Sequence, residues 1–287
     1  MVRETEPIAN NERAFVKNVI LEGLRVDNRS AHDVRTVKIN FGSQWGHSEV
    51  QLGKTRVAAT VSCEMVRPSP AQPTEGIIQF STEFSPMASP SIESGRLSEE
   101  EVLISRLLEK ALKRSRAIDT EGLCIVAGEK VWAVRVDIRV LDHNGNVLDC
   151  ACIAAVAALQ HFRRPDVTVV GEEVTIHSLD ERSPIPLSIF HIPICVTFAF
   201  FSNGERQVVD PSLLEEQIQE GDMTFVINIH RELCTLSKAG GIPIEGSQIL
   251  HCANIAAIKA AEITELIKAA NMESQTRKEK KKESKRE

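Results

Sequence analysis

Two acidic residues, Asp210 and Glu216, stand six positions apart in the segment VDPSLLEE and are the first candidates for chemistry. Two such carboxylates could together hold a divalent cation such as Mg²⁺. Asp210 also precedes Pro211, and this order is typical of a helix N-cap followed by proline at the first helical position. The sequence leaves both interpretations open.

The turn from Gly145 to Asp149 is the second candidate, because it opens a nearly all-apolar helix predicted over Val147–Phe162. The free N–H groups and the dipole at a helix start favour an anion. Asp149 places a negative charge on this first turn, where it would repel a phosphate. We expect Asp149 to act as a helix N-cap or a first-turn acid that stabilises the helix by about 0.5–2 kcal/mol.

The net charge of −6 divides into an acidic body and a basic tail. The last fifteen residues carry seven Lys/Arg and four Glu, a net charge of +3, so residues 1–272 carry −9. An acidic body argues against a protein that coats nucleic acid electrostatically. The segment Arg277–Arg286 fits an RNA contact, a nuclear-import signal or a solubilising tail.

Composition excludes several other classes of protein. No apolar run approaches the roughly twenty residues that span a bilayer, and the first residues are too polar for a secretory signal, so we expect a soluble, intracellular protein. Seven cysteines, an odd number mostly in apolar sequence, indicate reduced, buried thiols. Cys150 and Cys152 lack a second pair at zinc-ligand spacing, and the histidines are scattered, so we predict no metal ligand among them and no cofactor.

Hydrophobic periodicity predicts an α+β fold. The predicted helices are Asn10–Val19, Glu99–Arg116, Val147–Phe162 and Gly246–Asn271. Period-two alternation predicts an antiparallel meander followed by further short strands. The predicted strands are Val37–Phe41, Ser48–Leu52, Thr55–Cys63, Ile77–Phe84, Trp132–Leu141, Thr168–Ser178, Ile192–Phe200, Gln207–Asp210, Thr224–Ile229 and Leu233–Lys238.

Two of these helices are similar to each other. LDCACIAAVAA, from Leu148, and LHCANIAAIKA, from Leu250, share seven of eleven positions. We interpret them as the buried helices of two similar β-rich units that lie on a shared sheet system, although composition alone would also explain the match. The predicted organisation is a lead-in over 1–30, domains over 31–165 and 166–272, and a basic, disordered tail over 273–287.

Several motifs together resemble the ribonuclease PH superfamily of phosphate-dependent exonucleases and exosome ring subunits, over about residues 24–270. They are GLRVDNRSAHDVRTVKINFG, GHSEVQLGKTRVAATVS, IIQFSTEFSPMA, VLDHNGNVLDCACIAAVAAL and VDPSLLEE. The resemblance implies an α+β fold related to the second domain of ribosomal protein S5. It also implies a ring of six such subunits around an RNA-threading channel.

Departures from the family pattern fall at its phosphate-binding turn. Active members use Gly-Gly-Thr-Arg-Thr, whereas the matching turn here begins at Gly145. Val147 stands where the family has a hydroxyl, and Leu148 stands where it has the phosphate-binding arginine. Asp210 matches the first metal-binding carboxylate, and Glu216 is longer than the second by a methylene. The resemblance therefore implies a degenerate phosphate loop, a vestigial metal site and no phosphorolysis.

The resemblance also implies RNA contacts by basic residues near the long helix and in the preceding loop. These residues are Arg67, Arg96, Arg106, Lys113 and Arg116. Ten residues separate Arg96 from Arg106, where the family has six. Positive side chains at a solvent-exposed helix C-terminus also interact favourably with the helix dipole, and this explains Lys113 and Arg116 without RNA.

We therefore expect a non-catalytic ring subunit of the RNA exosome, which scaffolds the core and helps to thread RNA for 3′–5′ processing and decay. The implied partners are a catalytic-type RNase PH-like ring subunit, cap subunits with S1 and KH domains, and RNA. The implied location is the nucleus, the nucleolus and the cytoplasm. The alternative is an active Mg²⁺- and phosphate-dependent 3′–5′ exoribonuclease that uses Asp210 and Glu216.

Overall fold

A six-stranded sheet forms one half of the fold, in a computed structural model that describes residues 8–89, 92, 98–170, 173–177 and 181–283. Its strands are β1 (Val37–Phe41), β2 (His47–Leu52), β3 (Thr55–Val66), β4 (Ile77–Phe84), β5 (Cys124–Val126) and β6 (Lys130–Asp142). The order is β1-β2-β3-β6-β4, with β5 beside β6. The predicted antiparallel meander of β1, β2 and β3 is confirmed, whereas β4 runs parallel to β6.

A four-stranded antiparallel sheet in the order β12-β11-β13-β14 forms the other half. Its strands are β11 (Ile194–Phe201), β12 (Arg206–Val209), β13 (Gly221–Ile227) and β14 (Leu233–Ser237). Two short ribbons are formed by β7 (Arg163–Arg164) with β10 (Ile185–Pro186), and by β8 (Val167–Val170) with β9 (Glu173–Ile176). The single strand predicted over Thr168–Ser178 is therefore wrong, because β8 and β9 pair antiparallel within it, and positions 171–172 and 178 of that prediction lie outside the described residues.

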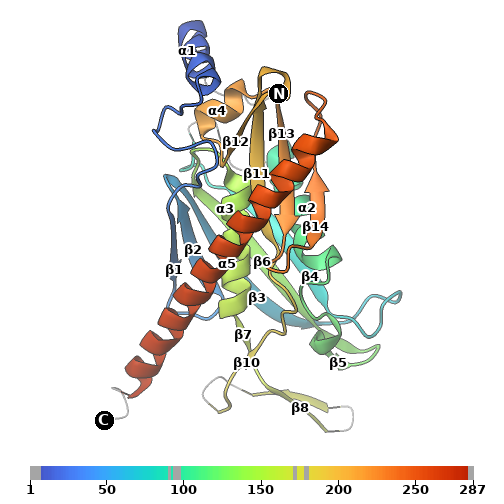
Figure 1. Cartoon of the computed structure of the whole chain (residues 1–287). Coiled ribbons are helices and arrows are strands. Elements are labelled where there is room, and N and C mark those ends of the chain that lie inside the picture. The colour runs from blue at the N-terminus through green and yellow to red at the C-terminus, as the bar shows by residue number, and fades with distance from the viewer. Residues whose placement is uncertain (1–7, 90–91, 93–97, 171–172, 178–180, 284–287) are drawn as a thin grey trace.

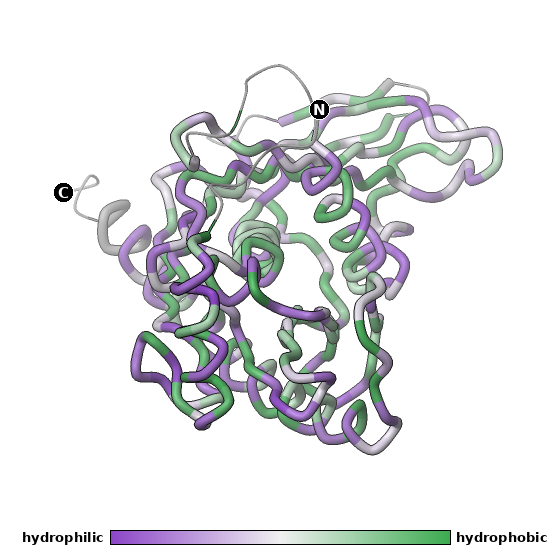
Figure 2. Tube along the Cα trace, turned by 90° about the horizontal axis from the view of Figure 1, so that it is seen from above, coloured by the Kyte–Doolittle hydropathy of each residue, from purple (hydrophilic) through white to green (hydrophobic). Residues whose placement is uncertain are grey.

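Helix α3 (Val147–His161) joins the two sheets, since it packs against β2 and β3 of the first and β11 of the second. Its alanines and cysteines are almost completely buried, and they let the sheets approach closely. Figure 2 shows this apolar helix end-on near the centre, surrounded by more hydrophilic outer loops. Helix α5 (Gly246–Glu283) packs on β11, β13 and α3. Both small-residue helices therefore contact β11, although the strands form two separate sheets and not one.

Helix α2 (Glu99–Leu108) covers the free edge of β4. Ser98 and Glu101 form the predicted capping box. Glu101 also accepts the backbone N–H of Phe84 at 2.8 Å, and Ser105 Oγ accepts that of Thr82 at 3.1 Å. These bonds protect an edge that would otherwise be open to another strand. The predicted α-helix to Arg116 is too long, because a π-helical turn replaces it over Glu109–Arg114.

Both ends of the chain carry helices that reach away from the sheets (Figure 1). Helix α1 (Asn10–Leu21) buries Val16 and Ile20 in a small second core near α4 (Leu213–Ile218). Helix α5 continues to Glu283, so the tail predicted to be disordered is helical over residues 273–283. In the described part of the chain, no helix has the length and apolar character needed to cross a membrane.

Candidate functional site

Asp210 follows β12 in a left-handed conformation, with φ +52°, and is only 1% exposed. Arg35 donates to its two carboxylate oxygens from Nε and Nη2, at 2.9 and 2.7 Å, and from its backbone N–H at 2.8 Å. Arg29 Nη1 donates at 3.0 Å and Asn146 Nδ2 at 2.7 Å. Burial opposes ionisation, but the hydrogen bonds and charge of Arg35 outweigh it and lower the pKa of Asp210. Asp210 is therefore an ionised anchor.

The interpretation of Asp210 as a helix cap followed by Pro211 is wrong. Helix α4 begins at Leu213, and Ser212 is its N-cap. The Ser212 side chain and Glu215 form a reciprocal capping box. The sequence carried this signal as a serine followed three residues later by glutamate.

Glu215 also binds a buried arginine of the N-terminal lead-in. Arg25 donates to its two carboxylate oxygens at 2.9 and 2.5 Å, and to the carbonyl oxygens of Val209 and Asp210 at 2.8 and 2.9 Å. Both charged side chains are at most 3% exposed. The lead-in is therefore fixed to the end of β12.

Asn146 connects the three acidic residues of the site. Its side chain donates to Asp149 at 2.8 Å as well as to Asp210, and its backbone N–H donates to Glu216 at 2.6 Å. Asn146 has φ +51° and caps α3 without a side-chain cap bond. It was not among our predicted site residues, although an asparagine after a glycine at a helix start is a turn signal.

Asp149 lies in the first turn of α3, as predicted, but it is not the N-cap. Its carboxylate crosses to β11, where the Thr197 N–H and Oγ donate to it at 2.9 and 2.8 Å. Burial raises the pKa of Asp149 to about 6, against the opposing effect of these bonds. Asp149 therefore holds α3 against the second sheet.

The start of α3 is occupied by the chain's own groups. The Glu216 carboxyl group accepts the Asn146 N–H, at the position where a helix N-terminus would offer its donors to an anion. Val147 is buried, and Leu148 packs partly buried against the same core. As the sequence predicted, this turn offers neither a hydroxyl nor a guanidinium at these two positions.

The residues present do not fit a Mg²⁺ site at Asp210 and Glu216. Mg²⁺ requires free carboxylate oxygens, and those of Asp210 accept bonds from Arg29, Arg35 and Asn146. The guanidinium groups of Arg29 and Arg35 would also repel a metal cation placed beside Asp210. Among the described residues, no group of three His, Cys, Asp or Glu side chains could hold a metal ion.

Gly145 lets the turn approach α4 closely. It has φ +85°, and a Cβ at this position would lie 2.5 Å from the backbone of Leu213 and Ser212. Its carbonyl accepts Thr55 Oγ at 2.7 Å and Arg35 Nη2 at 3.1 Å. Only glycine can occupy this position without moving the backbone.

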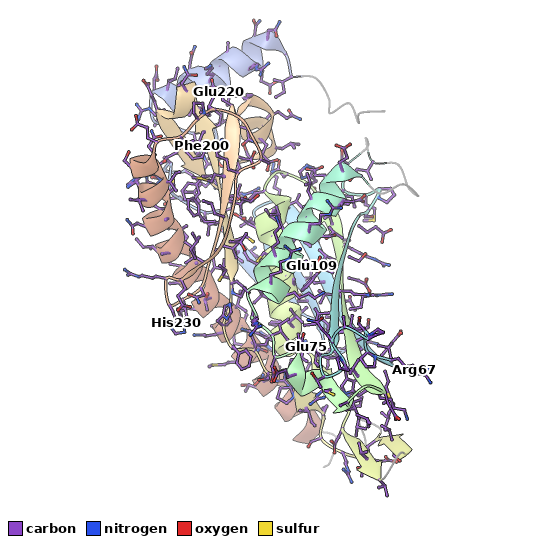
Figure 3. All side chains as sticks on the ribbon, turned by 90° about the vertical axis from the view of Figure 1, so that its right-hand side faces the viewer. Arg67, Glu75, Glu109, Phe200, Glu220 and His230 are labelled. Carbon is purple, nitrogen blue, oxygen red and sulfur yellow. The ribbon has the colours of Figure 1, made fainter. Side chains whose placement is uncertain are left out.

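The predicted RNA contacts lie elsewhere. Arg67 is exposed at the outer end of the connection between β3 and β4 (Figure 3). Arg106 is exposed on α2, and Lys113 and Arg116 are exposed at the end of the π-helical turn. Arg96 lies outside the described residues.

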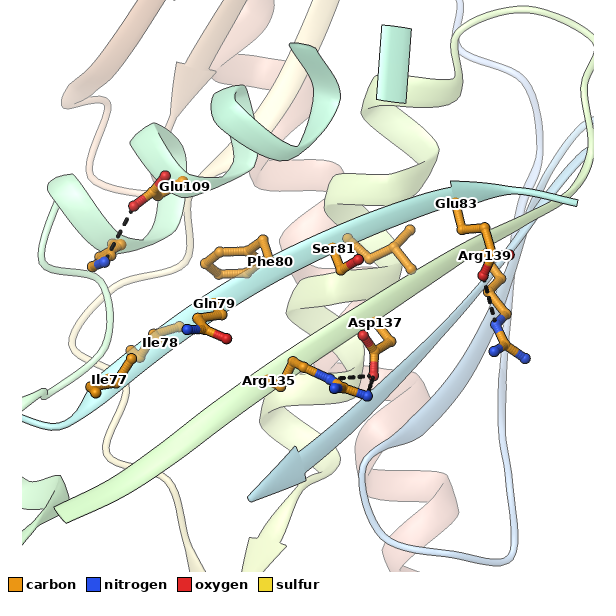
Figure 4. A pocket seen from close by; sticks show the side chains of 12 residues that line it. Ile77, Ile78, Gln79, Phe80, Ser81, Glu83, Glu109, Arg135, Asp137 and Arg139 are labelled. Carbon is orange, nitrogen blue, oxygen red and sulfur yellow. Dashed lines mark hydrogen bonds and ion pairs between the residues drawn. The ribbon is translucent and has the colours of Figure 1, made fainter. Parts of the chain in front are cut away.

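Two adjoining grooves bring two of these residues onto one surface. The first, of about 740 Å³, lies along β4 and β6 and includes Lys113 and Arg139 (Figure 4). The second, of about 270 Å³, includes Arg67. Both grooves are lined by Arg135, which sequence reasoning missed although VRVDIRV alternates as an exposed strand face does. Neither groove is lined by Arg106 or Arg116.

Comparison with known families identifies the chain. The 3′ exoribonuclease family, domain 1, matches residues 33–165, and domain 2 of the same family matches residues 191–259. The chain belongs to the ribonuclease PH family. The resemblance inferred from the motifs is thereby confirmed, together with the α+β fold that it implied.

Relatives of this ribonuclease PH-like chain align with nearly all of it. The exosome complex component RRP45 of Danio rerio is 50% identical over 97% of this chain and 71% of its own length. The rrp45 component of Schizosaccharomyces pombe is 48% identical over 97% of this chain and 96% of its own. The chain spans 63–71% of the vertebrate relatives that it matches.

A solved structure supports the same assignment. A chain of the Archaeoglobus fulgidus exosome with RNA bound to the active site superimposes with a TM-score of 0.78. It is 28% identical and aligns over 89% of this chain and 97% of its own.

Gly145→Ala tests the close approach of the turn to α4. We expect a loss of unfolding free energy of about 3 kcal/mol or more, because backbone strain of about 1–2 kcal/mol adds to a clash with backbone atoms. Gly23→Ala is the matched control, with φ +82° and open space around its Cβ position, and should cost only the strain. Urea denaturation measures both variants, and equal losses would contradict the close approach.

Glu216→Gln tests the buried carboxyl group. Burial raises the pKa of Glu216 to about 8 from its ordinary value of 4.5. The folded chain therefore keeps a proton that the unfolded chain releases between these values, and wild type loses stability as pH rises through this window. Glutamine does not titrate and still accepts the Asn146 N–H. We expect the variant to gain at least about 1 kcal/mol relative to wild type between pH 5 and 8.

The control for this experiment is Glu205→Gln, which changes an exposed glutamate of the same half of the chain. Its stability should follow that of wild type at every pH. Urea denaturation of the three proteins across this range measures the difference, and a Glu216→Gln curve parallel to wild type would contradict a raised pKa.

Proposed function

We propose that this chain is a non-catalytic ring subunit of an RNA exosome. In this role it scaffolds the core and helps to guide RNA toward 3′–5′ processing and decay. The proposal is supported by relatives that are named exosome complex component RRP45 and by the similarity to archaeal exosome cores.

The observation that carries the non-catalytic part is the network around Asn146. Phosphorolysis brings an inorganic phosphate to the terminal phosphodiester, so a site must supply donors for two anions. Here the Glu216 carboxyl group accepts the N–H at the start of α3, and Arg29 and Arg35 are bonded to Asp210. The groups that would bind phosphate are thus engaged within the protein.

The alternative function is an active Mg²⁺- and phosphate-dependent 3′–5′ exoribonuclease that uses Asp210 and Glu216. The residues of the site disfavour this alternative. Two arginines neutralise the carboxylate of Asp210, and Leu148 has no positive charge that could bind a phosphate. Membership of an exoribonuclease family is the one observation that favours an active enzyme, and an activity assay distinguishes it from a non-catalytic subunit.

The partners proposed for the chain follow from the same assignment. We expect it to pair with a catalytic-type RNase PH-like subunit, to contact cap subunits with S1 and KH domains, and to bind RNA within the assembly. We propose the nucleus, the nucleolus and the cytoplasm as its location.

Phosphorolysis is tested by incubating the purified chain with single-stranded RNA, Mg²⁺ and phosphate. We expect no release of nucleoside diphosphates by the chain alone, because its phosphate-binding turn is filled. In complex with a catalytic-type partner, we expect release at a rate that Glu216→Gln leaves unchanged.

Release by the isolated chain that disappears in Glu216→Gln would instead establish the exoribonuclease. Circular dichroism of the variant checks that any loss of activity does not come from unfolding.

RNA guidance is tested on the surface that carries Arg67 and Lys113. In the assembled ring, Arg67→Ala and Lys113→Ala should each reduce the slope of log affinity against log salt for single-stranded RNA by about 0.7. Lys268→Ala removes a charge from α5, away from both grooves, and should leave the slope unchanged. Filter binding at several salt concentrations measures the slope, and identical slopes for all variants would exclude these contacts.

A further inference from the structure

Strand β1 ends the six-stranded sheet, and β2 is its one partner among the described strands. The backbone of Gly42 donates to His47, and Asn40 stands opposite Glu49 in the same ladder. Alternate residues of an antiparallel edge strand bond to the neighbour, and those between them point outward. The backbone N–H and C=O groups of Ile39 and Phe41 therefore face away from β2. Among the described residues, none is shown bonded to these outward groups.

A groove of about 560 Å³ runs beside this edge, between residues 39–43 and the stretch 270–278 of α5. Its volume is within the range of ligand-binding clefts, about 300–1,000 Å³. Figure 1 shows the C-terminal half of α5 extending past β1 on this side of the molecule. The edge strand is thus the floor of a cleft and not a flat border.

Aromatic and basic side chains close one end of the groove. Lys278 Nζ lies 3.8 Å from the centre of the Trp45 ring and 2.6 Å from His161 Nε2. The guanidinium of Arg163 lies 5.3 Å from the same ring, and the rings of Phe41 and His161 are 4.7 Å apart. These contacts fix α5 to the first sheet, so the groove has two rigid walls.

We propose that the groove between β1 and α5 is a docking site for an extended, acidic segment of a partner polypeptide, which adds to β1 as a further strand. The main chain of such a segment would bond to Ile39 and Phe41, as in peptide recognition by strand addition. The site does not include the network around Asp210, and its test requires no ring assembly. It therefore stands or fails separately from the proposed function.

The outward backbone groups favour a polypeptide over RNA. They alternate donors and acceptors at the two-residue spacing of an extended strand, and a peptide backbone matches both kinds. The phosphate oxygens of RNA accept hydrogen bonds only, so they would leave the carbonyls of Ile39 and Phe41 unmatched, and the donors that RNA has, its 2′-hydroxyls and base groups, do not follow the spacing of a strand.

The charges around the groove select acidic residues in the segment. Arg277, Lys278 and Glu273 line the α5 wall, and Arg277 lies 3.9 Å from Glu273, so this wall carries a net charge of +1. Lys38 is exposed on the edge strand itself and adds a further positive charge. Directly opposite side chains on neighbouring strands attract each other when their charges are opposite. Ile39 and Phe41 pack toward the core face of the sheet, so they favour apolar neighbours. A segment that alternates acidic and apolar residues fits both faces.

The test uses a fluorescein-labelled peptide that alternates glutamate with valine, titrated into the full chain while fluorescence polarisation is recorded. We expect saturable binding that weakens at least tenfold in Arg277→Glu, and also when lysine replaces glutamate in the peptide. Lys268→Glu makes the same kind of charge reversal on α5 outside the groove and should bind as wild type does.

Amide hydrogen exchange, followed by NMR, locates the bound strand. The amides of Ile39 and Phe41 should exchange rapidly in the free chain and at least tenfold more slowly with the peptide. The amide of Asn40, which faces β2, should remain slow in both states.

Four results would overturn the proposal. The first is that the peptide does not bind, and the second is that it binds but leaves the Ile39 and Phe41 amides unprotected. The third is that oligouridylate protects these amides and the peptide does not. The fourth is that their protection rises with protein concentration when no peptide is present. The third would assign the groove to RNA, and the fourth would assign it to a second copy of this chain.

Discussion

The buried ion pair between Arg35 and Asp210 is the contact on which the rest of the site depends. The Arg35 guanidinium also donates to the carbonyl oxygens of Asn144 and Gly145, so it ties the turn before α3 to the end of β12. The Arg35 and Asp210 side chains are 9% and 1% exposed. Removing one partner of such a pair typically costs about 3–5 kcal/mol, because the other is left buried and uncompensated. The turn, the start of α3 and the entry to α4 are therefore held as one unit.

The same interaction gives a different meaning to the acidic composition of the body. Glu215 and Asp210 pair with Arg25 and Arg29 of the lead-in and with Arg35 just after it, so this cluster carries no net negative charge and the acidic charge of the body lies on other residues. Charges that are satisfied internally cannot also bind an incoming phosphate. The stability of this cluster and the loss of phosphate binding that we propose would thus have a common cause. In the function that we propose, a ring subunit built in this way would leave RNA contacts to other surfaces, such as the exposed cations along β4 and β6.

Features that depend on burial could be predicted from the sequence, and features that depend on distant partners could not. The apolar run of α3 and the alternation of β4 and β6 follow directly from what each face contacts. Asp149 was expected to be a helix N-cap or a first-turn acid, and Asp210 to be a metal ligand or a helix cap. Their partners are instead Thr197 on β11 and Arg35 near the start of the chain, and pairing over such separations leaves no periodic trace. Ser212 shows the opposite case, because its capping partner is three residues away and the signal was readable.

The C-terminal part of α5 is helical although its composition predicts disorder, and contacts with residues distant in the sequence account for the difference. A charged, low-hydrophobicity segment gains too little from burial to order itself, so disorder was the reasonable prediction for residues 273–287. Lys278, however, meets the face of Trp45, a contact worth about 0.5–2 kcal/mol. Burial, with the nearby charge of Lys278, lowers the pKa of His161 to about 4, so this ring stays neutral beside the ammonium group near pH 7. Because a helix already formed in α5 extends at little further cost, the contacts of Lys278 with Trp45 and His161 favour its continuation past the core.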